Sequence, residues 1–376
     1  MQNPTCFWEQ QFWPKNPDFT IIGAGIVGLS AAIEIKKRAP KASVHILEKS
    51  PIGAGASSRN AGFTCFGSPT ELLSDLKVMP AEELIELIQM RWSGLQILLD
   101  RCGKTEIEYH NWGSTECFLP DANAEYHSAK SQLPFLNELI KDAIELPECF
   151  SDLHLQDHGF NLHQNGFFNQ YEGQIDTGKM YQKLEQLAMQ SGVIISRGAN
   201  IESIDFEDHP ILHFQEQFPA IRTKNLLICT NGFSQELMPN LDCFPARAQV
   251  LVSSPINQLP FKGTFHMDEG YYYFRNIGNR VLLGGGRNLD IPGETSTNRT
   301  VNEKIQIELE KLLRNRILPK HTFNIDYQWT GIMGTGKVKK PIIEKKGNHC
   351  LVGVRLGGMG VAIGSHLGNQ MAKIIV

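Results

Sequence analysis

The chain has 376 residues, of which 41% are hydrophobic and 20% are charged, so it can bury a sizeable core and is neither disordered nor collagen-like. At roughly 100–200 residues per domain, the length predicts two domains. The 36 Lys and Arg residues against 40 Asp and Glu residues give a net charge of −4 with no long block of either sign, which argues against nucleic acid as a partner.

Two features argue against a secreted or membrane-spanning protein. Residues Met1 to Cys6 contain neither the basic region nor the apolar stretch that begins a secretory signal. The longest apolar stretches, residues 19–33 and 351–363, are interrupted by glycines, and the second also contains Arg355. We therefore expect no transmembrane segment and a cytoplasmic location.

The eight cysteines are scattered along the chain, and no two have C-x-x-C spacing. This pattern disfavours a zinc ribbon, an iron–sulfur cluster and a dithiol redox centre. We expect buried thiols in a reducing compartment and no metal site.

The segment from Asp18 to Glu48 has the pattern of a strand, a glycine turn, a helix and a second strand. The first strand is Phe19–Ile22, the turn is Gly23–Gly28, the helix covers Leu29–Arg38 and the second strand covers Ser43–Leu47. This order predicts a βαβ unit with a right-handed crossover.

The glycine turn matches the G-x-G-x-x-G pattern of dinucleotide-binding folds. Gly23 suits the tight turn, Gly25 lets the backbone approach a pyrophosphate, and Gly28 allows close helix–strand packing. Glu48 follows Gly28 by the spacing of about 20 residues at which a carboxylate binds the ribose hydroxyls, and its charge disfavours NADP. The alternatives are a chance glycine turn and a solvated carboxylate at the end of a strand.

The loop from Ile52 to Phe63 favours a flavin over a nicotinamide cofactor. It is rich in small and hydroxyl-bearing residues, which can wrap a second phosphate and let a flat ring approach the backbone. The alternative is a flexible surface linker, in which Arg59, Asn60 and Phe63 would be unusual.

The remaining elements divide into two styles. Residues 71–78, 81–101 and 128–139 have helical patterns. A helix at residues 179–190 with strands at residues 193–195 and 224–229 is typical of an α/β domain. Strands at residues 249–252, 271–275 and 280–284, followed by a helix at residues 301–314, indicate an antiparallel domain inserted into the first. A strand at residues 349–353 and a glycine turn at residues 357–364 then lead into a final helix.

These stretches resemble the flavin amine-oxidoreductase family that includes D-amino-acid oxidase, glycine oxidase, sarcosine oxidase and γ-glutamylputrescine oxidase. The similarity extends from Asp18 to Ile375. It is carried by IIGAGIVGLSAAIEI, GAGASSRNAGF, GQIDTGKMYQKLEQLA, LLICTNGFS, YYYFR with VLLGGG, and WTGIMGTGKVKKP with GVRLGGMGVAIGSHLG.

The resemblance implies an α/β fold class: an FAD-binding Rossmann-like domain with a parallel sheet and an inserted α+β substrate domain with a mixed or antiparallel sheet. We assign residues 1–85, 170–235 and 325–376 to the FAD-binding domain and residues 86–169 and 236–324 to the substrate domain.

The resemblance also implies extended FAD, with its flavin ring at the boundary of the two domains and the turn before the last helix near the pyrimidine end of the ring. In the sarcosine-oxidase branch a cysteine links FAD covalently, but residues 331–335 contain none here, so we expect noncovalent FAD. The residues expected to bind FAD are Gly23, Gly25, Ile26, Val27, Gly28, Glu48, Lys49, Ser57, Ser58, Arg59, Asn60, Ala61, Gly62, Ile201, Thr230, Asn231, Gly232, Gly331, Gly357, Gly358, Met359 and Gly360.

The family's chemistry implies oxidation of a C–N bond in a small amine or amino acid, with dioxygen or a carrier as electron acceptor. A dedicated catalytic base is not required, and we name none. Two alternatives stay open: an FAD-dependent dehydrogenase of hydroxyacids or glycerol phosphate, and an FAD-binding module without turnover.

One departure from the family concerns the substrate. The glycine-oxidase pattern W-x-G-x-R-P uses its Arg to bind the substrate carboxylate, whereas Trp329–Gly334 has Met333 in that place. A methionine cannot form this ion pair. Either the substrate lacks an α-carboxylate, which favours a polyamine-like or N-substituted amine, or another cation such as Arg275, Arg247 or Lys337 binds it.

The YYYFR strand supplies the other pocket candidates. Strand alternation places Tyr271 and Tyr273 on one face and Tyr272 on the other. The pair could hold a cationic amine, and the alternative is plain packing against neighbouring strands. We expect Arg275 and Arg287 to form surface or domain-boundary salt bridges. The candidate substrate-pocket residues are Tyr271, Tyr273, Arg275 and Met333.

Overall fold

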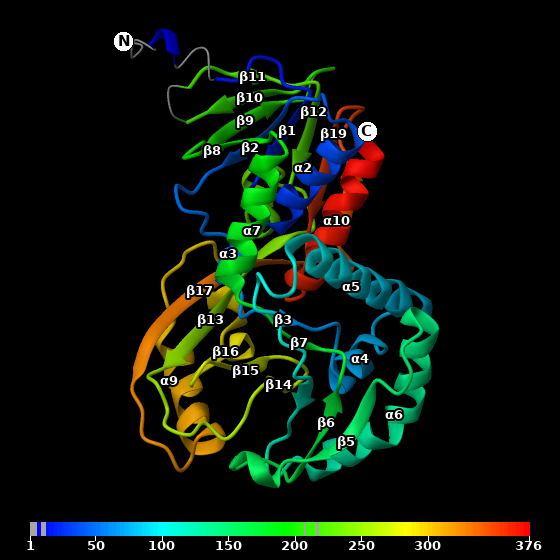
Figure 1. Cartoon of the computed structure of the whole chain (residues 1–376), viewed down its shortest axis with the longest axis vertical. Helices are drawn as coiled ribbons and strands as arrows, with labels where there is room; N and C mark the ends of the chain where they lie inside the picture. Colours follow the sequence, from blue (N-terminus) through cyan, green and yellow to red (C-terminus); the bar gives the residue numbers. More distant parts are fainter. Residues whose placement is uncertain (1–5, 9–12, 207, 216–217) are drawn as a thin grey trace. The chain divides into compact units, whose positions relative to one another are not determined.

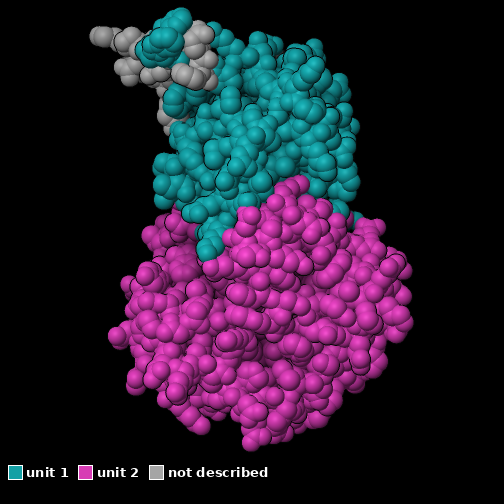
Figure 2. Space-filling model, viewed as in Figure 1, with its two compact units in different colours: residues 1–58, 178–246, 333–376 teal, residues 59–177, 247–332 magenta. Residues whose placement is uncertain are grey.

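The computed structural model describes the chain apart from residues 1–5, 9–12, 207 and 216–217 (Figure 1). The chain divides into two compact units (Figure 2). Unit 1 comprises residues 1–58, 178–246 and 333–376, and unit 2 comprises residues 59–177 and 247–332. The predicted division also has three segments in one domain and two in the other, but its boundaries differ: it places residues 59–85, 170–177 and 325–332 in the first domain and residues 236–246 in the second.

Unit 1 is built on a six-stranded sheet in the order β18-β19-β12-β1-β2-β8. β1 lies inside the sheet and pairs in parallel with both β2 and β12, as the predicted βαβ unit requires. β18 is the one antiparallel strand and forms an edge. The strands are β1 (Phe19–Ile22), β2 (Val44–Glu48), β8 (Ile194–Arg197), β12 (Asn225–Ile228), β18 (Ile342–Lys345) and β19 (Cys350–Val354).

Two helices of unit 1, α2 (Ile26–Arg38) and α10 (Gly360–Ile375), lie side by side (Figure 1). Gly368 of α10 faces α2 so closely that an added Cβ would lie 2.5 Å from the backbone oxygen of Val27. Small residues therefore allow the two backbones to approach. The other elements of unit 1 are α3 (Ala56–Arg59), α7 (Thr177–Gln190) and a small antiparallel sheet of β9 (Ile201–Asp205), β10 (Ile211–Phe214) and β11 (Ile221–Arg222).

Unit 2 is built on an eight-stranded mixed sheet in the order β17-β13-β16-β15-β14-β4-β6-β5. β14 pairs in parallel with β4, whereas β15 pairs antiparallel with both β14 and β16. The strands are β4 (Ser114–Glu116), β5 (Phe150–His154), β6 (Asn165–Asn169), β13 (Phe244–Ser253), β14 (Thr264–Met267), β15 (Tyr272–Ile277), β16 (Arg280–Gly285) and β17 (Ile325–Thr335). A parallel-sheet domain with an inserted mixed-sheet domain confirms the predicted fold class.

The two faces of β15 differ, as strand alternation predicts. Tyr272 and Phe274 pack on the main apolar core of unit 2, which includes Phe265 and Leu283. Tyr273 points to the other face and packs with a smaller apolar cluster.

The helices of unit 2 follow the predicted ones closely except for the third, which is longer, and for the short helix α8 (Ile291–Glu294), which was not predicted. The third helix was predicted at residues 128–139, but α6 runs from Asn123 to Ile144 and contains Pro134 in its interior. Its buried stripe begins at Tyr126 and ends at Ala143, so apolar packing outweighs the hydrogen bond that Pro134 removes. The other elements are α4 (Pro69–Asp75), α5 (Ala81–Cys102), α9 (Glu303–Leu312), a π-helical turn (Leu313–Ile317), β3 (Phe63–Thr64) and β7 (Gly173–Gln174).

Among the described residues, no helix is long and apolar enough to cross a membrane. Residues 1–5, on which the expectation about a secretory signal depends, lie outside the described part of the chain. All eight cysteines are described. Seven of them are buried, Cys6 is exposed, and no disulfide joins any two.

Candidate functional site

The turn between β1 and α2 depends on glycine at two positions for reasons of space. A Cβ added at Gly28 would lie 2.0 Å from the backbone oxygen of Gly23, and one added at Gly23 would lie 2.7 Å from that of Cys229. Gly25 differs, because its nearest neighbour would be the Ser57 hydroxyl at 3.0 Å. Gly23 and Gly28 thus serve packing, whereas Gly25 is less enclosed by the protein.

The positive end of α2 lies directly after this turn. The first turn of α2 contains no acidic residue of its own that would neutralise the partial positive charge there. The Ile26 amide donates a hydrogen bond to Ser57 Oγ at 2.9 Å, which fixes the second glycine-rich loop against the helix start. Such an end favours a phosphate group.

Glu48 lies at the end of β2, next to the turn. Its Oε2 accepts a hydrogen bond from the Ala24 amide at 2.9 Å, and its Oε1 accepts one from the Ser50 amide at 2.9 Å. The carboxylate therefore fixes the turn, and each oxygen keeps a lone pair for a further donor such as a ribose hydroxyl.

Three further glycines of unit 1, which lie in loops after β2 and β19, have open space beside them. A Cβ added at Gly55, Gly357 or Gly358 would meet no heavy atom within 4 Å. Thr230, which follows β12, has a buried hydroxyl without a hydrogen-bond partner among the described residues. The space beside these glycines and the unpaired hydroxyl of Thr230 fit an extended dinucleotide such as FAD.

Asn231, which we expect beside the cofactor, also supports the fold. Its Oδ1 accepts hydrogen bonds from the amides of Arg355 at 3.1 Å and Leu356 at 3.3 Å, so it fixes the turn that precedes α10. Arg355 has φ +66° and donates to Asp242 Oδ2 at 2.6 Å. Neither Arg355 nor Asp242 was predicted to support this turn. The charge of Arg355 inside an apolar segment was the available signal.

The other predicted cofactor residues of unit 1 lie in varied surroundings. Lys49 is exposed and forms an ion pair with Glu236 at 3.0 Å. Ser58 Oγ donates to the backbone oxygen of Gly53 at 2.6 Å, which stabilises the second loop. Ile201 begins β9 and packs on the unit 1 core. The remaining ones are Ile26 and Val27 in α2, Gly232 after β12, and Met359 and Gly360 at the start of α10.

In unit 2, the segment around Arg59, expected to bind FAD, lies beside Trp329–Gly331 of β17. Trp329 Nε1 donates to the backbone oxygen of Arg59 at 3.0 Å, and Arg59 Nη1 donates to that of Thr330 at 3.1 Å. A Cβ added at Gly331 would contact Arg59 at 3.7 Å. Burial and the nearby Arg299 guanidinium lower the pKa of Arg59.

The Asn60–Gly62 segment is held from two sides. Asn60 Oδ1 accepts hydrogen bonds from the Gly62 amide at 2.8 Å and from Thr177 Oγ1 at 3.0 Å. Gly62 has φ +74°, which favours glycine. Ala61, between them, is buried.

Of the expected surface or domain-boundary salt bridge of Arg275, the surface location is wrong, because its side chain is buried. Its side chain is 5% exposed, and Nη1 donates to the backbone oxygens of Gly62 at 3.2 Å and Ile175 at 2.8 Å. Burial lowers the pKa of Arg275 to about 10. A strand pattern alone could not show this, because the carbonyl acceptors come from distant segments.

An aromatic group lies on the second face of β15. The rings of Phe63 and Tyr273 contact edge to face at 5.5 Å between centroids, and both pack with Trp329 on the cluster around Val250. Tyr271 lies just before β15 and is 40% exposed. Of the predicted tyrosine pair, Tyr273 therefore belongs to this face.

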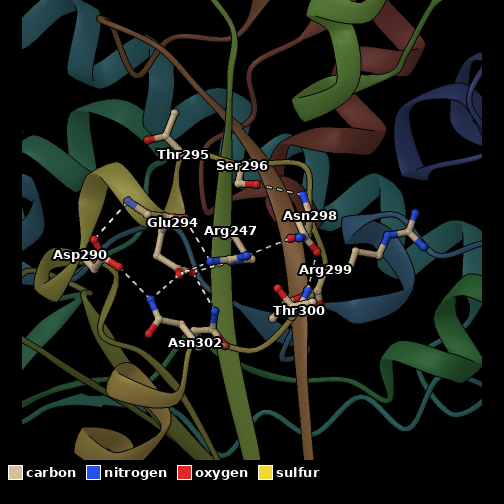
Figure 3. Close-up of polar contacts among 12 residues, drawn as sticks. Arg247, Asp290, Glu294, Thr295, Ser296, Asn298, Arg299, Thr300 and Asn302 are labelled. Carbon is tan, nitrogen blue, oxygen red and sulfur yellow. Dashed lines mark hydrogen bonds and ion pairs between the residues drawn. The ribbon is translucent and has the colours of Figure 1, made fainter.

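Arg247 is fully engaged in a buried network (Figure 3). Its Nε and Nη2 bind both oxygens of Glu294 at 3.0 and 2.7 Å, and Nη1 donates to the backbone oxygen of Asn298. Gln249 and Asn302 donate to the same carboxylate at 2.8 and 2.9 Å. Burial opposes ionisation of Glu294, but the hydrogen bonds from Arg247 and these amides outweigh it and lower the pKa of the carboxyl.

The chain matches the family described as DAO, FAD dependent oxidoreductase, over residues 18–374. It belongs to this family.

Known proteins similar to this FAD-dependent oxidoreductase include the probable oxidoreductase OrdL of Haemophilus influenzae, which is 20% identical over 96% of this chain and 83% of its own length. L-proline dehydrogenase from P. horikoshii has a TM-score of 0.76 at 14% identity, covering 96% of this chain and 94% of that chain. Glycine oxidase from Geobacillus kaustophilus has a TM-score of 0.71 at 16% identity, covering 96% and 95%. These structures share the fold.

Replacement of Gly25 should weaken FAD retention without unfolding the protein. Wild type, Gly25→Ala and Gly25→Leu should retain progressively less FAD, because the added side chain occupies the approach to the pyrophosphate. Bound FAD per chain and the melting temperature of the apoprotein are the measurements. Gly28→Ala is the comparison, since its Cβ meets Gly23 and should lower the melting temperature itself. A Gly25→Leu protein with a full complement of FAD would contradict the assignment.

Loss of the Glu294 carboxylate should destabilise the protein strongly. Glu294→Ala leaves a buried, unpaired Arg247, which costs about 3–5 kcal/mol of unfolding free energy. Glu310→Ala, which removes a half-exposed ion pair with Arg314, should cost less than about 1 kcal/mol. Equilibrium urea denaturation compares the two variants, and equal losses would show that the network of Figure 3 contributes little.

Proposed function

We propose that this FAD-dependent oxidoreductase oxidises the C–N bond of a small amine. The observation that carries the proposal is the glycine-lined end of unit 1, where the positive end of α2, whose first turn has no acidic residue, lies next to Glu48. These features fit a dinucleotide cofactor, and the family supplies its identity as FAD.

FAD, when bound, would supply the two-electron acceptor for oxidation of the substrate C–N bond, with dioxygen or a carrier as the final acceptor. The role of the protein chain is to bind and orient the cofactor. The Gly23–Gly28 turn and α2 would hold the pyrophosphate, and Glu48 the ribose. Amides at Gly357–Gly360 and the start of α10 would stabilise negative charge on the ring.

The preference for an amine over an α-amino acid rests on the cations of the chain. Met333 replaces the carboxylate-binding Arg of the glycine-oxidase pattern. Three other cations could bind a substrate carboxylate in its place. Arg247 is already bound to Glu294, and Arg275 donates to two backbone oxygens. Lys337 is exposed. The half-buried rings of Phe63, Tyr273 and Trp329 would suit a cationic or apolar amine.

The names of similar proteins support C–N chemistry. Glycine oxidase and L-proline dehydrogenase are named for substrates that contain a C–N bond. One is an oxidase and the other a dehydrogenase, so we propose no single electron acceptor. The absence of a cysteine at residues 331–335 supports noncovalent FAD, and eight cysteines without a disulfide support a cytoplasmic location.

Matched substrate pairs test the proposal. Pyrrolidine with proline, and putrescine with ornithine, differ by the α-carboxylate alone. Anaerobic loss of flavin absorbance should be faster with the amine of each pair. Met333→Arg should accelerate the reaction of the carboxylated partner by about tenfold to hundredfold, as hydrogen bonds to charged groups worth roughly 1.5–3 kcal/mol imply. Met333→Leu is the control and should leave the preference unchanged.

Three results would contradict the proposal. Faster reduction by the amino acids would show that another cation binds their carboxylate. Reduction by hydroxyacids or glycerol phosphate without reduction by amines would favour the dehydrogenase alternative. Stoichiometric FAD that no compound reduces would favour a binding module without turnover.

A further inference from the structure

Three side chains with metal-binding atoms meet inside unit 2. Cys65 follows β3, Glu172 precedes β7, and His266 lies in β14. Their sulfur, oxygen and nitrogen ligand atoms all lie within 4.8 Å of one another. The residues are 7%, 1% and 8% exposed, so the group is enclosed by protein.

Pairing of short strands positions these ligands. β3 pairs antiparallel with β7, with Thr64 opposite Gly173, which brings the adjacent Cys65 and Glu172 together. Glu172 Oε1 accepts hydrogen bonds from the amides of Phe66 at 2.8 Å and Gly67 at 3.3 Å. The loop after Cys65 thus orients the carboxylate.

His266 is held by the main sheet and by an aromatic contact. It lies opposite Glu116 of β4 and Tyr273 of β15 in the strand register. Its ring lies 5.2 Å from that of Phe63, between centroids. The imidazole therefore belongs to a rigid part of unit 2.

The imidazole carries an unused ligand atom that points into this group. Its Nε2 is buried and has no hydrogen-bond partner among the described residues. Glu172 Oε2 lies 3.9 Å away, which is too long for a hydrogen bond. A buried polar atom without a partner costs free energy, and a cation between the two residues would remove that cost.

We propose that Cys65, Glu172 and His266 bind a divalent transition-metal cation of the Zn²⁺ class. One thiolate, one carboxylate and one imidazole are the donors that tetrahedral Zn²⁺ takes in proteins, and water would complete the coordination. Binding releases the Cys65 thiol proton to solvent, after which the thiolate and the carboxylate balance the charge of the cation.

The site goes beyond the proposed function, because it requires neither FAD nor an amine. The metal would join three segments that are far apart in sequence, at residues 65, 172 and 266, and would stabilise unit 2. The expectation of no metal site rested on cysteine spacing along the sequence, which is insensitive to a site with one cysteine.

Metal binding by the untagged full-length flavoprotein tests this site. After treatment with a chelator and equilibrium dialysis against Zn²⁺, elemental analysis should find about one Zn²⁺ per chain. Cys65→Ser and His266→Asn should lose it. Cys117→Ser is the matched control, because Cys117 is also buried, follows the neighbouring β4 and lies outside the group. It should keep the metal.

A second measurement uses the wild-type chain, so it does not depend on the folding of variants. Co²⁺ should give ligand-field absorption at wavelengths beyond the flavin bands, as thiolate-bound tetrahedral Co²⁺ does, and Zn²⁺ should abolish it. Zn²⁺ should also raise the melting temperature, and a chelator should reverse the rise. A folded wild type that binds no Zn²⁺, or equal binding by Cys65→Ser and Cys117→Ser, would overturn the proposal.

Discussion

The close approach between the β1–α2 turn and the elements around it is the constraint on which unit 1 depends. Gly28 has no room for a side chain, because a Cβ added there would lie 2.0 Å from the backbone oxygen of Gly23. This contact places the start of α2 directly at the end of β1, so the amides and the positive helix end face the edge of the parallel sheet. Negative groups of a nucleotide are stabilised at that place.

The rest of unit 1 follows from this geometry. Glu48 can bind both the turn and a further hydroxyl because β2 ends beside it. The second glycine-rich loop is fixed to the helix start through Ser57. α10 packs against α2 through small residues and offers its own N-terminus after an open glycine turn. The same close packing that forms the fold therefore leaves space for a flat, extended cofactor.

Much of the fold could be predicted from local sequence patterns. The β1–α2–β2 unit was predicted almost to its ends, since alternation of strand, glycine and helix residues is a local signal. The hairpin of β15 and β16 and the faces of β15 were predicted for the same reason. The ends of α6 were not, because tertiary burial from Tyr126 to Ala143 carries the helix through Pro134.

The candidate site was predictable where it depends on backbone and less so where it depends on distant partners. Glycines that must lack a side chain are visible in the sequence. The carbonyl oxygens that bury Arg275, the Glu294 that occupies Arg247 and the turn fixed by Asn231 come from far along the chain. Cys65, Glu172 and His266 share no sequence spacing, so their meeting could be seen in the folded chain alone.

The central claim is that unit 1 recognises the adenosine diphosphate half of FAD. Titration of the apoprotein with FAD and with FMN, with ADP as competitor, tests it most directly. FAD should bind about a hundredfold or more tightly than FMN, because FMN lacks the groups that make several charge-assisted hydrogen bonds of roughly 1.5–3 kcal/mol each, and ADP should compete with FAD. Equal affinity for FMN and FAD, or no competition by ADP, would contradict the account.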